Sequence, residues 1–345
     1  MVLTMGYIGF GKSTTRYHMP YTLIRDHIRI KTIYNHRRKP ELEADYAKYG
    51  IQFTDQLDEL LQDIEIQLVS ICTPASTHYE LAKKALQNGK NVLVEKPFCT
   101  TSEEAEELFE LAKSKGLIAM AYQNRRFDSD FLAVKEVLAS GKIGDLVELE
   151  SHMDYYRPEA PDSDGEYYDG AFYGLGVHMM DQIIDLFGRP EEVSYDIRSV
   201  RNPNNPDDTF EVQFFYPKHK VIVKTSHLVN IPYPKFILHG TKGSFVKYGI
   251  DQQETCLKAG VMPGDANFGI DPESHYGTLV YVNENNETVQ ETVPTPLGDY
   301  GRLYDQLHDA ILNSTQKLVS DNETLTNMTI LEQGFTGKNP RVISL

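Results

Sequence analysis

Apolar residues in the first third of the chain form short, nearly continuous runs separated by helical spacing. The runs predict strands over residues 2–8, 28–34, 68–72, 91–94 and 117–121. Helices are expected from about Ser13, over 57–61 and 78–88, and from Ser102 as the N-cap to Gly116. Short buried strands that alternate with helices are typical of a parallel, doubly wound α/β sheet.

Beyond about residue 122 the pattern changes to alternation of apolar and polar positions. This predicts antiparallel strands over 146–156, 193–200, 210–216, 221–228, 236–239 and 278–282. Helices are expected near 131–138, 177–187 and 300–311, and a long loop over 260–277. The prediction is therefore two domains. Residues 1–122 form the parallel sheet, and residues 123–345 form an α+β domain with a large, mostly antiparallel sheet.

Charge and cysteine content narrow the classes of function. The 345 residues carry a formal net charge of −16, which disfavours nucleic acid and anionic membranes as partners. Cys72, Cys99 and Cys256 are odd in number and widely spaced, as in reduced cytosolic proteins. No leader pattern and no apolar run of about 18 residues is visible. A soluble cytoplasmic protein is expected.

A glycine-rich turn follows the first strand. Gly9-Phe10-Gly11-Lys12-Ser13-Thr14 matches the dinucleotide pattern G-x-G-x-x-G at two glycines, with Thr14 in the third place. The first glycine allows a tight turn, and the second lets backbone amides approach a pyrophosphate at a helix N-terminus. Its position between a strand and a helix favours a Rossmann dinucleotide-binding domain over an ordinary loop.

The end of the second strand indicates which dinucleotide is bound. A site that prefers NAD usually has an acid here for the ribose 2′-hydroxyl, whereas this chain has Asn35-His36-Arg37-Arg38-Lys39. A carboxylate would repel a 2′-phosphate, and a guanidinium can grip it. The prediction is NADP(H), with Arg37 and then Arg38 on the phosphate. The alternative is a solvated basic turn on the surface.

An ordered set of motifs resembles the Gfo/Idh/MocA oxidoreductases over essentially the whole chain. After the glycine turn come Thr73-Pro74 with His78, Glu95-Lys96-Pro97, Asn124-Arg125-Arg126-Phe127, Gly174-x-Gly176-x-His178-x-x-Asp181 and Gly240-Thr241-Lys242-Gly243-Ser244. Tyr155-Tyr156-Arg157-Pro158 and Lys247-Tyr248-Gly249-Ile250-Asp251 are most similar to the NADP-dependent scyllo-inositol dehydrogenase branch.

Lys96 is the first candidate catalytic residue. It leaves an apolar strand just before a proline, at the carboxyl end of a parallel sheet where such folds bind ligands. A partly desolvated lysine can exchange a proton with a substrate hydroxyl. The resemblance implies that Lys96 is catalytic or orients substrate, that Pro97 is often cis, and that Glu95 lies by the nicotinamide ribose. The plain alternative is a surface lysine.

His178 is the second candidate. It begins a predicted helix with Asp181 three residues later on the same face, an arrangement suited to general acid–base work. A histidine that only caps the helix is the alternative. His-x-x-Asp without a third ligand nearby is too sparse for zinc, so no metal is predicted.

Gly174 departs from the family pattern. The resemblance implies an aspartate at this place, four residues before the histidine, which shares the proton relay. Either Asp181, Asp169 or a tyrosine takes over this task, or the chemistry is slow or absent.

Tyrosines near these motifs suggest how a polyol is held. Tyr155, Tyr156, Tyr167, Tyr168 and Tyr173 offer flat apolar faces with hydrogen-bonding tips. For any single one, a role in sheet packing is the simpler interpretation.

The main hypothesis is an NADP-dependent oxidoreductase of a polyol or sugar, in which Lys96 and His178 handle the hydroxyl proton. Substrate would contact Asp181, Tyr156 and Arg157. The expected cofactor-binding residues are Gly9, Phe10, Gly11, Lys12, Ser13, Asn35, Arg37, Thr73, Pro74, His78, Glu95, Lys96 and Arg125. A catalytically silent NADP-binding sensor is the alternative, because some family members are regulators. A third hypothesis, glycoside chemistry in which bound NAD is retained by the enzyme, fits poorly with the basic stretch after the second strand. A homodimer or higher homo-oligomer is expected, since large antiparallel sheets often need covering.

Overall fold

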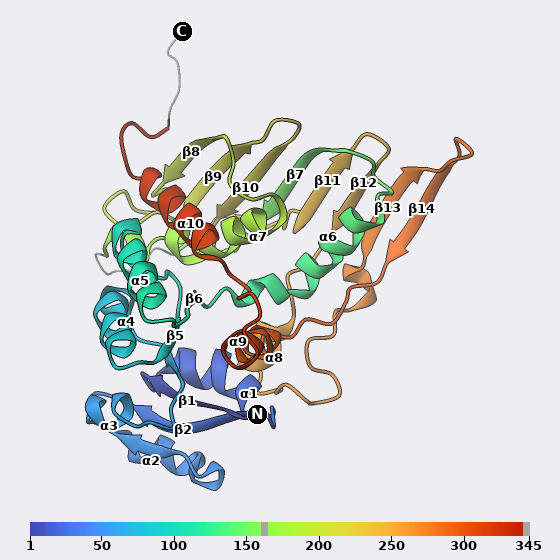
Figure 1. Cartoon of the computed structure of the whole chain (residues 1–345). Coiled ribbons are helices and arrows are strands. Elements are labelled where there is room, and N and C mark those ends of the chain that lie inside the picture. Colours follow the sequence, from blue (N-terminus) through green and yellow to red (C-terminus); the bar gives the residue numbers. More distant parts are fainter. Residues whose placement is uncertain (160–164, 341–345) are drawn as a thin grey trace. The chain divides into compact units, whose positions relative to one another are not determined.

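The chain folds into two compact units, both drawn in Figure 1. The structure is a computed structural model that describes residues 1–159 and 165–340. The first unit comprises Met1–Asn124, Glu254–Phe268 and Asp299–Met328. The second comprises Arg125–Gln253, Gly269–Gly298 and the chain from Thr329 onward. Two later segments therefore join the first unit, in addition to the N-terminal part that the sequence assigns to it.

The first unit is built on a parallel sheet with strand order β3-β2-β1-β4-β5-β6. Its strands are β1 (Leu3–Ile8), β2 (Ile28–Tyr34), β3 (Gln52–Thr54), β4 (Leu68–Ile71), β5 (Asn91–Val94) and β6 (Ala119–Ala121). Each adjacent pair runs parallel. The order reverses between β1 and β4, and in doubly wound sheets ligands bind at the carboxyl ends beside such a reversal. The expected Rossmann sheet is confirmed.

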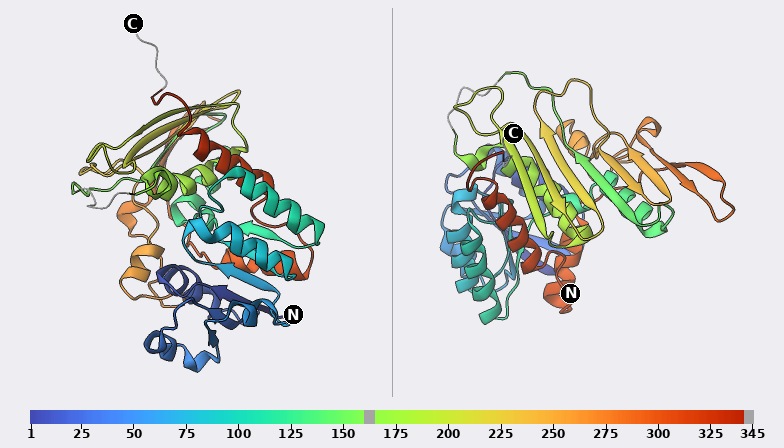
Figure 2. Two further views of the ribbon diagram at one scale, coloured as in Figure 1. Left: turned by 90° about the vertical axis from the view of Figure 1, so that its left-hand side faces the viewer. Right: turned by 90° about the horizontal axis from the view of Figure 1, so that it is seen from above.

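Helices connect these strands. They are the π-helix η1 (Thr14–His18), α1 (Met19–Thr22), α2 (Pro40–Asp45), α3 (Leu57–Leu61), α4 (His78–Gln87) and α5 (Ser102–Ser114), with α4 and α5 side by side in Figures 1 and 2. Short 3₁₀ turns lie at η2 (Ala47–Tyr49) and η3 (Ala75–Thr77). The N-cap of α5 is Thr101 rather than the expected Ser102. Its hydroxyl accepts from the amide of Glu104, whose carboxylate bonds back in a capping box.

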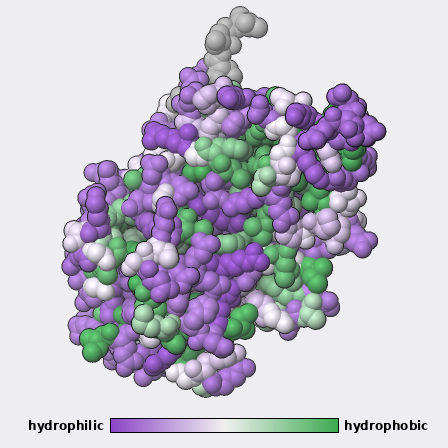
Figure 3. All heavy atoms as spheres, turned by 45° about the vertical axis from the view of Figure 1, so that its right-hand side comes forward, coloured by the Kyte–Doolittle hydropathy of each residue, from purple (hydrophilic) through white to green (hydrophobic). Residues whose placement is uncertain are grey.

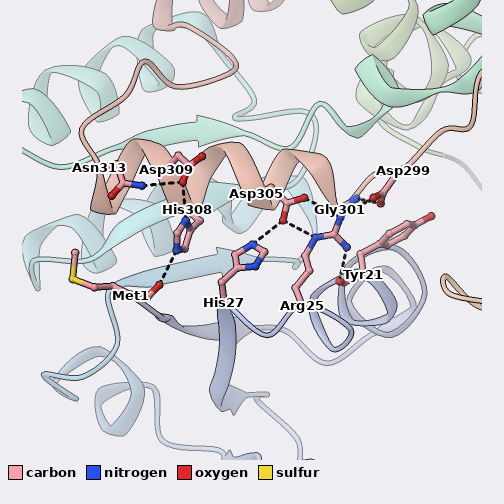
Figure 4. A network of polar contacts seen from close by, with 10 residues as sticks. All are labelled: Met1, Tyr21, Arg25, His27, Asp299, Gly301, Asp305, His308, Asp309 and Asn313. Atoms are coloured by element: carbon pink, nitrogen blue, oxygen red, sulfur yellow. Dashed lines mark hydrogen bonds and ion pairs between the residues drawn. The ribbon is translucent and has the colours of Figure 1, made fainter.

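A later helix, α9 (Arg302–Leu312), completes the first unit and is anchored by ion pairs (Figure 4). Arg25, just before β2, donates from Nη2 to Asp299 and from Nε to Asp305, each at 2.7 Å. His27 bonds the same Asp305 at 2.8 Å, and His308 bonds the carbonyl of Met1 at 2.9 Å. These contacts fix α9 against the start of the sheet.

The second unit contains a sheet with strand order β14-β13-β12-β11-β7-β10-β9-β8. Its strands are β7 (Leu146–His152), β8 (Glu192–Arg198), β9 (Thr209–Phe215), β10 (Lys220–Ser226), β11 (Phe236–Gly240), β12 (Gly243–Lys247), β13 (Gly277–Val282) and β14 (Thr288–Val293). β7 and β10 pair in parallel, and every other pair of described neighbours is antiparallel. The expected mostly antiparallel sheet is confirmed.

One face of this sheet is covered by helices. The helical elements of the second unit are α6 (Ser129–Ser140), η5 (Tyr167–Asp169), the π-helix η6 (Phe172–Gly176), α7 (Val177–Phe187) and η7 (Glu273–His275). Three further elements have residues in both units: η4 (Asn124–Phe127), α8 (Gln253–Lys258) and α10 (Asp321–Gln333). Figures 1 and 2 show α6 and α7 along the same face. Buried and half-buried residues alternate along β9 and β10 because only one side of each strand packs beneath these helices.

Hydrophilic residues predominate on the face of the molecule drawn in Figure 3, in keeping with the large negative charge. In the part of the chain that the structure describes, no helix combines the length and apolar character needed to cross a bilayer.

Candidate functional site

The glycine turn after β1 leaves its backbone open. Gly9 has φ +101°, a conformation that L side chains rarely adopt, and a Cβ there would lie 2.7 Å from the carbonyl oxygen of Cys72. At Gly11 a Cβ would meet nothing within 4 Å, so space lies in front of the turn. This open cradle fits the requirement of a pyrophosphate for close backbone approach.

Side chains from neighbouring strands hold this turn in place. Asn35, after β2, accepts from the Phe10 amide at 2.9 Å, and Lys39 donates to the Phe10 carbonyl at 2.6 Å. The hydroxyl of Thr14 donates to the carbonyl of Gly9 at 2.8 Å. Thr14 therefore closes the turn where the common pattern has glycine. The Phe10 ring is buried against Phe53, and its amide and carbonyl are engaged by Asn35 and Lys39, so Phe10 shapes the turn.

The two arginines of the basic stretch after β2 differ in whether their guanidinium groups are engaged by other side chains. Arg38 is engaged by Glu43, which accepts from Nη2 at 2.6 Å and from Nε at 2.9 Å. The hydrogen bonds from Arg38 lower the pKa of the Glu43 carboxyl more than burial raises it, so this pKa lies below its usual range. Arg37 is exposed, and among the described residues its guanidinium has no ion pair or hydrogen bond. Of the two, Arg37 is the one whose guanidinium is open to a ligand.

His78 ties together the loops after β4 and β5. Its Nε2 faces the carbonyl of Thr73 and its Nδ1 faces the carbonyl of Pro97, both at 2.8 Å. The ring is almost fully buried. His78 thus positions the Thr73-Pro74 loop and the Glu95-Lys96-Pro97 loop relative to each other, a task that fits a cofactor site without direct contact.

Glu95 links the Lys96 loop to the glycine turn. Its Oε1 accepts from the hydroxyl of Ser13 and lies 3.0 Å from Nε2 of His18, and its Oε2 accepts from the Lys96 amide at 3.0 Å. Burial opposes ionisation, but the bond and charge of His18 and the charge of Lys96 outweigh it and lower the pKa of Glu95 to about 2. Lys96 is half-buried, and its peptide bond to Pro97 is cis.

His18 is a site residue that the sequence analysis missed. It ends η1, is fully buried, stacks on Tyr122 and lies 2.6 Å through Nδ1 from the hydroxyl of Tyr304. Burial disfavours its charged form, but Cys72 and then Glu95 outweigh this and raise its pKa to about 9. Its partner lies 77 residues away, so no local pattern could have identified it.

In the second unit, His178 is the second residue of α7 and is buried. The π-helix η6 runs directly into α7, so His178 lies inside a continuous helical segment rather than at its start. The interpretation of His178 as a simple helix cap is therefore wrong. At Gly174, within η6, a Cβ would meet nothing within 4 Å, so the missing aspartate would have had room.

Asp181 is held by Arg126, which the sequence analysis did not single out. Arg126 donates to its two carboxylate oxygens at 2.8 and 2.9 Å, and a third bond reaches Asp185 at 2.9 Å. Arg126 and Asp181 are both almost fully buried. Arg125, expected on the cofactor, belongs to this second unit and donates to Asp128 at 3.2 Å.

The predicted substrate residues Tyr156 and Arg157 lie beyond the end of β7. Tyr156 is 55% exposed and forms an isolated bridge with Leu228. The guanidinium of Arg157 lies 4.1 Å from the ring centroid of Tyr155. Both are exposed enough to meet a ligand.

Two of the predicted tyrosines, Tyr167 and Tyr173, lie in an aromatic cluster of the second unit. Tyr167 and Tyr173 contact Phe335, and Tyr173 is fully buried. Asp169 accepts from the amide of Glu166 and caps its own turn. In the described residues, no cluster of three or more His, Cys, Asp or Glu side chains could hold a metal ion.

Comparison with known proteins agrees with this arrangement. The family description "Oxidoreductase family, NAD-binding Rossmann fold" matches residues 3–123, and "Oxidoreductase family, C-terminal alpha/beta domain" matches residues 135–341. The oxidoreductase YhhX of Escherichia coli is 57% identical over 346 residues, 100% of this chain and 99% of the relative. The scyllo-inositol 2-dehydrogenase (NADP(+)) IolW of Bacillus subtilis is 32% identical over 348 residues, 99% of this chain and 96% of the relative.

A solved structure of an oxidoreductase from Bacillus cereus is 52% identical and superposes with a TM-score of 0.97, covering 100% of this chain and 99% of that one. The matches to both domains and the near-complete overlap with these relatives lead to one conclusion. The chain belongs to the Gfo/Idh/MocA family of oxidoreductases.

Proposed function

We propose that the protein is an NADP-dependent dehydrogenase that moves hydride between the nicotinamide and a CH–OH carbon of a polyol or sugar of the inositol kind. The observation that carries this proposal is the link from Ser13, in the glycine turn, through Glu95 to Lys96. It joins a dinucleotide cradle to a lysine at the carboxyl edge of β5. The activity named for the Bacillus subtilis relative supports both NADP and an inositol.

The bound nicotinamide would supply the hydride acceptor or donor, and the protein's own residues would manage the proton. As the C–H hydride leaves an alcohol carbon, the hydroxyl proton moves to the Lys96 amine and a carbonyl forms; reduction runs the same steps in reverse. His178 serves as a second proton carrier. Asp181 is bound by Arg126, so it orients the helix face that carries His178, and Tyr156 and Arg157 contact the substrate.

Cofactor choice rests on Arg37. Its guanidinium is exposed, while Arg38 is engaged by Glu43. Arg37→Ala should weaken NADPH binding about tenfold, the order of one exposed charge-assisted contact, and leave NADH binding unchanged. Lys39→Ala is unsuitable as a control because Lys39 holds the glycine turn, whereas Lys48→Ala removes a charge elsewhere in the same unit. Equal loss for both cofactors would refute the assignment.

The test of the reaction is absorbance at the nicotinamide band during incubation with NADP⁺ or NAD⁺ and a panel of inositols and aldoses. Turnover should be faster with NADP⁺, and Lys96→Ala should lower kcat about 10²-fold or more. Wild-type rates in Lys96→Ala would refute the assigned chemistry.

The sensor function remains the second candidate because Gly174 leaves no carboxylate at that place. Tight NADPH binding with no turnover across the panel would favour it. A cytoplasmic location and a homo-oligomer stay predictions.

A further inference from the structure

Two consecutive acidic residues, Asp207 and Asp208, lie directly before β9 in the second unit, and the proposed reaction uses neither of them. Asp207 is 7% exposed and Asp208 is 2% exposed. Acidic side chains this deeply buried are rare unless other groups hydrogen-bond to them. Their partners therefore indicate what each of them holds in place.

Asp207 anchors the start of the helical segment that carries His178. Its Oδ2 accepts from the Phe172 amide at 2.7 Å, and its backbone carbonyl accepts from the Ala171 amide at 2.8 Å. Phe172 is the first residue of η6, which runs directly into α7. Because the first amides of a helix have no partner inside the helix, Asp207 supplies acceptors that this segment needs.

The carboxyl group of Asp207 fits closely against Gly170. A Cβ on Gly170 would clash with Oδ1 of Asp207, so only glycine leaves room for the group. Burial raises the pKa of Asp207 most, and the charge of Asp208 adds to this, so that the pKa is about 7 despite the bond from the Phe172 amide. The neutral acid is therefore well populated at pH 7, and an asparagine offers the same carbonyl acceptor.

Asp208 holds the segment of residues 155–159, here called the substrate segment, through Arg201. Arg201 donates from Nε to Asp208 at 2.9 Å. It also donates from Nη1 to the carbonyls of Arg157 and Glu159, each at 2.8 Å. The planar fork of a guanidinium can span a carboxylate and two carbonyls at once, which a lysine ammonium on the same backbone cannot do in this fixed geometry.

His227 provides a second connection between Asp208 and the substrate segment. Its amide donates to the carbonyl of Asp208 at 3.0 Å, and its own carbonyl accepts from the Arg157 amide at 2.8 Å. Its Nδ1 lies 3.1 Å from Nη2 of Arg201 and accepts from it, because a guanidinium only donates. Both backbone and side-chain bonds therefore tie the substrate segment to Asp208.

We propose that Asp207 and Asp208 are positioning residues that fix two segments of the candidate site from one point of the fold. Asp207 sets the helical segment that carries His178, and Asp208, through Arg201, sets the substrate segment. Because the two acids are consecutive, one place before β9 determines where both segments lie within the second unit. The roles of these segments in proton transfer and substrate binding rest on the proposed function, whereas the anchoring does not.

The test measures backbone hydrogen exchange by mass spectrometry in peptides that cover residues 155–159 and 171–178. Asp207→Ala should raise exchange over 171–178 about fivefold, the order of one lost helix cap, and leave 155–159 unchanged. Arg201→Lys keeps a positive charge for Asp208 but loses the fork. It should raise exchange over 155–159 about tenfold, the order of a lost hydrogen bond from a charged donor, and leave 171–178 unchanged.

Two variants serve as controls. Asp207→Asn keeps the acceptor for the helix and should exchange within about twofold of the wild type over 171–178. Asp145→Asn removes an exposed carboxylate of the same unit and should change neither segment. If Asp207→Ala does not fold, Gly170→Ala replaces it, because its Cβ would push the Asp207 carboxyl group away and should raise exchange over 171–178 in the same way.

The proposal would be overturned by equal rises in both segments in either variant, or by no rise in folded Asp207→Ala or Arg201→Lys. The exchange measurement needs no turnover, so absence of activity on the polyol panel would refute the proposed function alone.

If turnover is found, the kinetic constants separate positioning from a general loss of packing. Arg201→Lys should raise KM for the alcohol about tenfold with kcat within about twofold of the wild type. Asp207→Ala should instead lower kcat about tenfold with KM within about twofold. A general loss of packing would change both constants alike in both variants, and that result would overturn the proposal.

Discussion

Raising the pH from 6.5 to 9 should destabilise the protein through the buried His18, whose charged form is favoured by Cys72 and then by Glu95. The pKa of His18 is raised from 6.5 to about 9 in the folded protein. A group whose pKa is raised on folding contributes its full stability below the unfolded value and loses it as the pH rises through the folded value. This difference in pKa corresponds to about 3 kcal/mol of the free energy of unfolding. About 2–3 kcal/mol of that contribution is lost when the pH rises from 6.5 to 9.

The low pKa of Glu95 already contains the interaction of Glu95 with His18, so its energy is not added to that of His18. That carboxylate contributes above its unfolded pKa of 4.5, and the contribution is lost only as the pH falls towards 2. It therefore does not change the free energy of unfolding between pH 6.5 and 9, and the alkaline window reports on His18.

The assay is urea unfolding followed by circular dichroism at pH 6.5 and pH 9. The free energy of unfolding should fall between these values in the wild type and in the control His308→Gln, which removes a different histidine of the same unit. In His18→Gln this fall should be smaller by about 2–3 kcal/mol, because the titrating group is gone. Ionisable groups that do not interact with His18 are shared by all three proteins, so their contributions cancel in this comparison. The same pH dependence in wild type and His18→Gln would refute the reasoning.

Three further substitutions test other parts of the structure. Gly9→Ala should abolish measurable NADPH binding in fluorescence titration, because its φ of +101° and the Cys72 carbonyl leave no room for a Cβ; binding at wild-type strength would contradict the described turn. Arg126→Met should lower the free energy of unfolding by about 3–5 kcal/mol in urea, since it leaves the buried Asp181 carboxylate without its guanidinium, and a loss below about 1 kcal/mol would argue against the pair. Gly174→Asp should leave the melting temperature within a few degrees of wild type because the added side chain enters open space; a fall above about 10 °C would contradict this.

The sequence predicts best those elements whose residues share one environment along their whole length. The strand over residues 28–34 matches β2 at both ends, because its apolar residues are buried in a parallel sheet. By contrast, β14 was missed because its residues TVQETV are exposed or half-buried throughout, so no apolar run marks it. The strand expected over 146–156 ends at His152, after which Tyr156 makes only an isolated bridge.

The candidate site was predicted where its chemistry is local in sequence and missed where it is not. Glu95 and Lys96 follow directly from a strand and its proline. The partners that set their charge come from elsewhere, since His18 lies 77 residues before Glu95. Arg126 likewise lies 55 residues before Asp181. Such pairs form only through the tertiary fold, and a single sequence carries no signal that joins them.

The transfer of deuterium tests the central claim most directly. The protein is incubated with NADPH carrying deuterium at the transferring C4 position and with a keto-inositol, and the product is analysed by mass spectrometry. The proposed function predicts a polyol heavier by one deuterium on the former carbonyl carbon, formed by the wild type and reduced about 10²-fold or more in Lys96→Ala. Wild-type protein that binds NADPH but delivers no deuterium to keto-inositols or to the carbonyl forms of the sugars would contradict it.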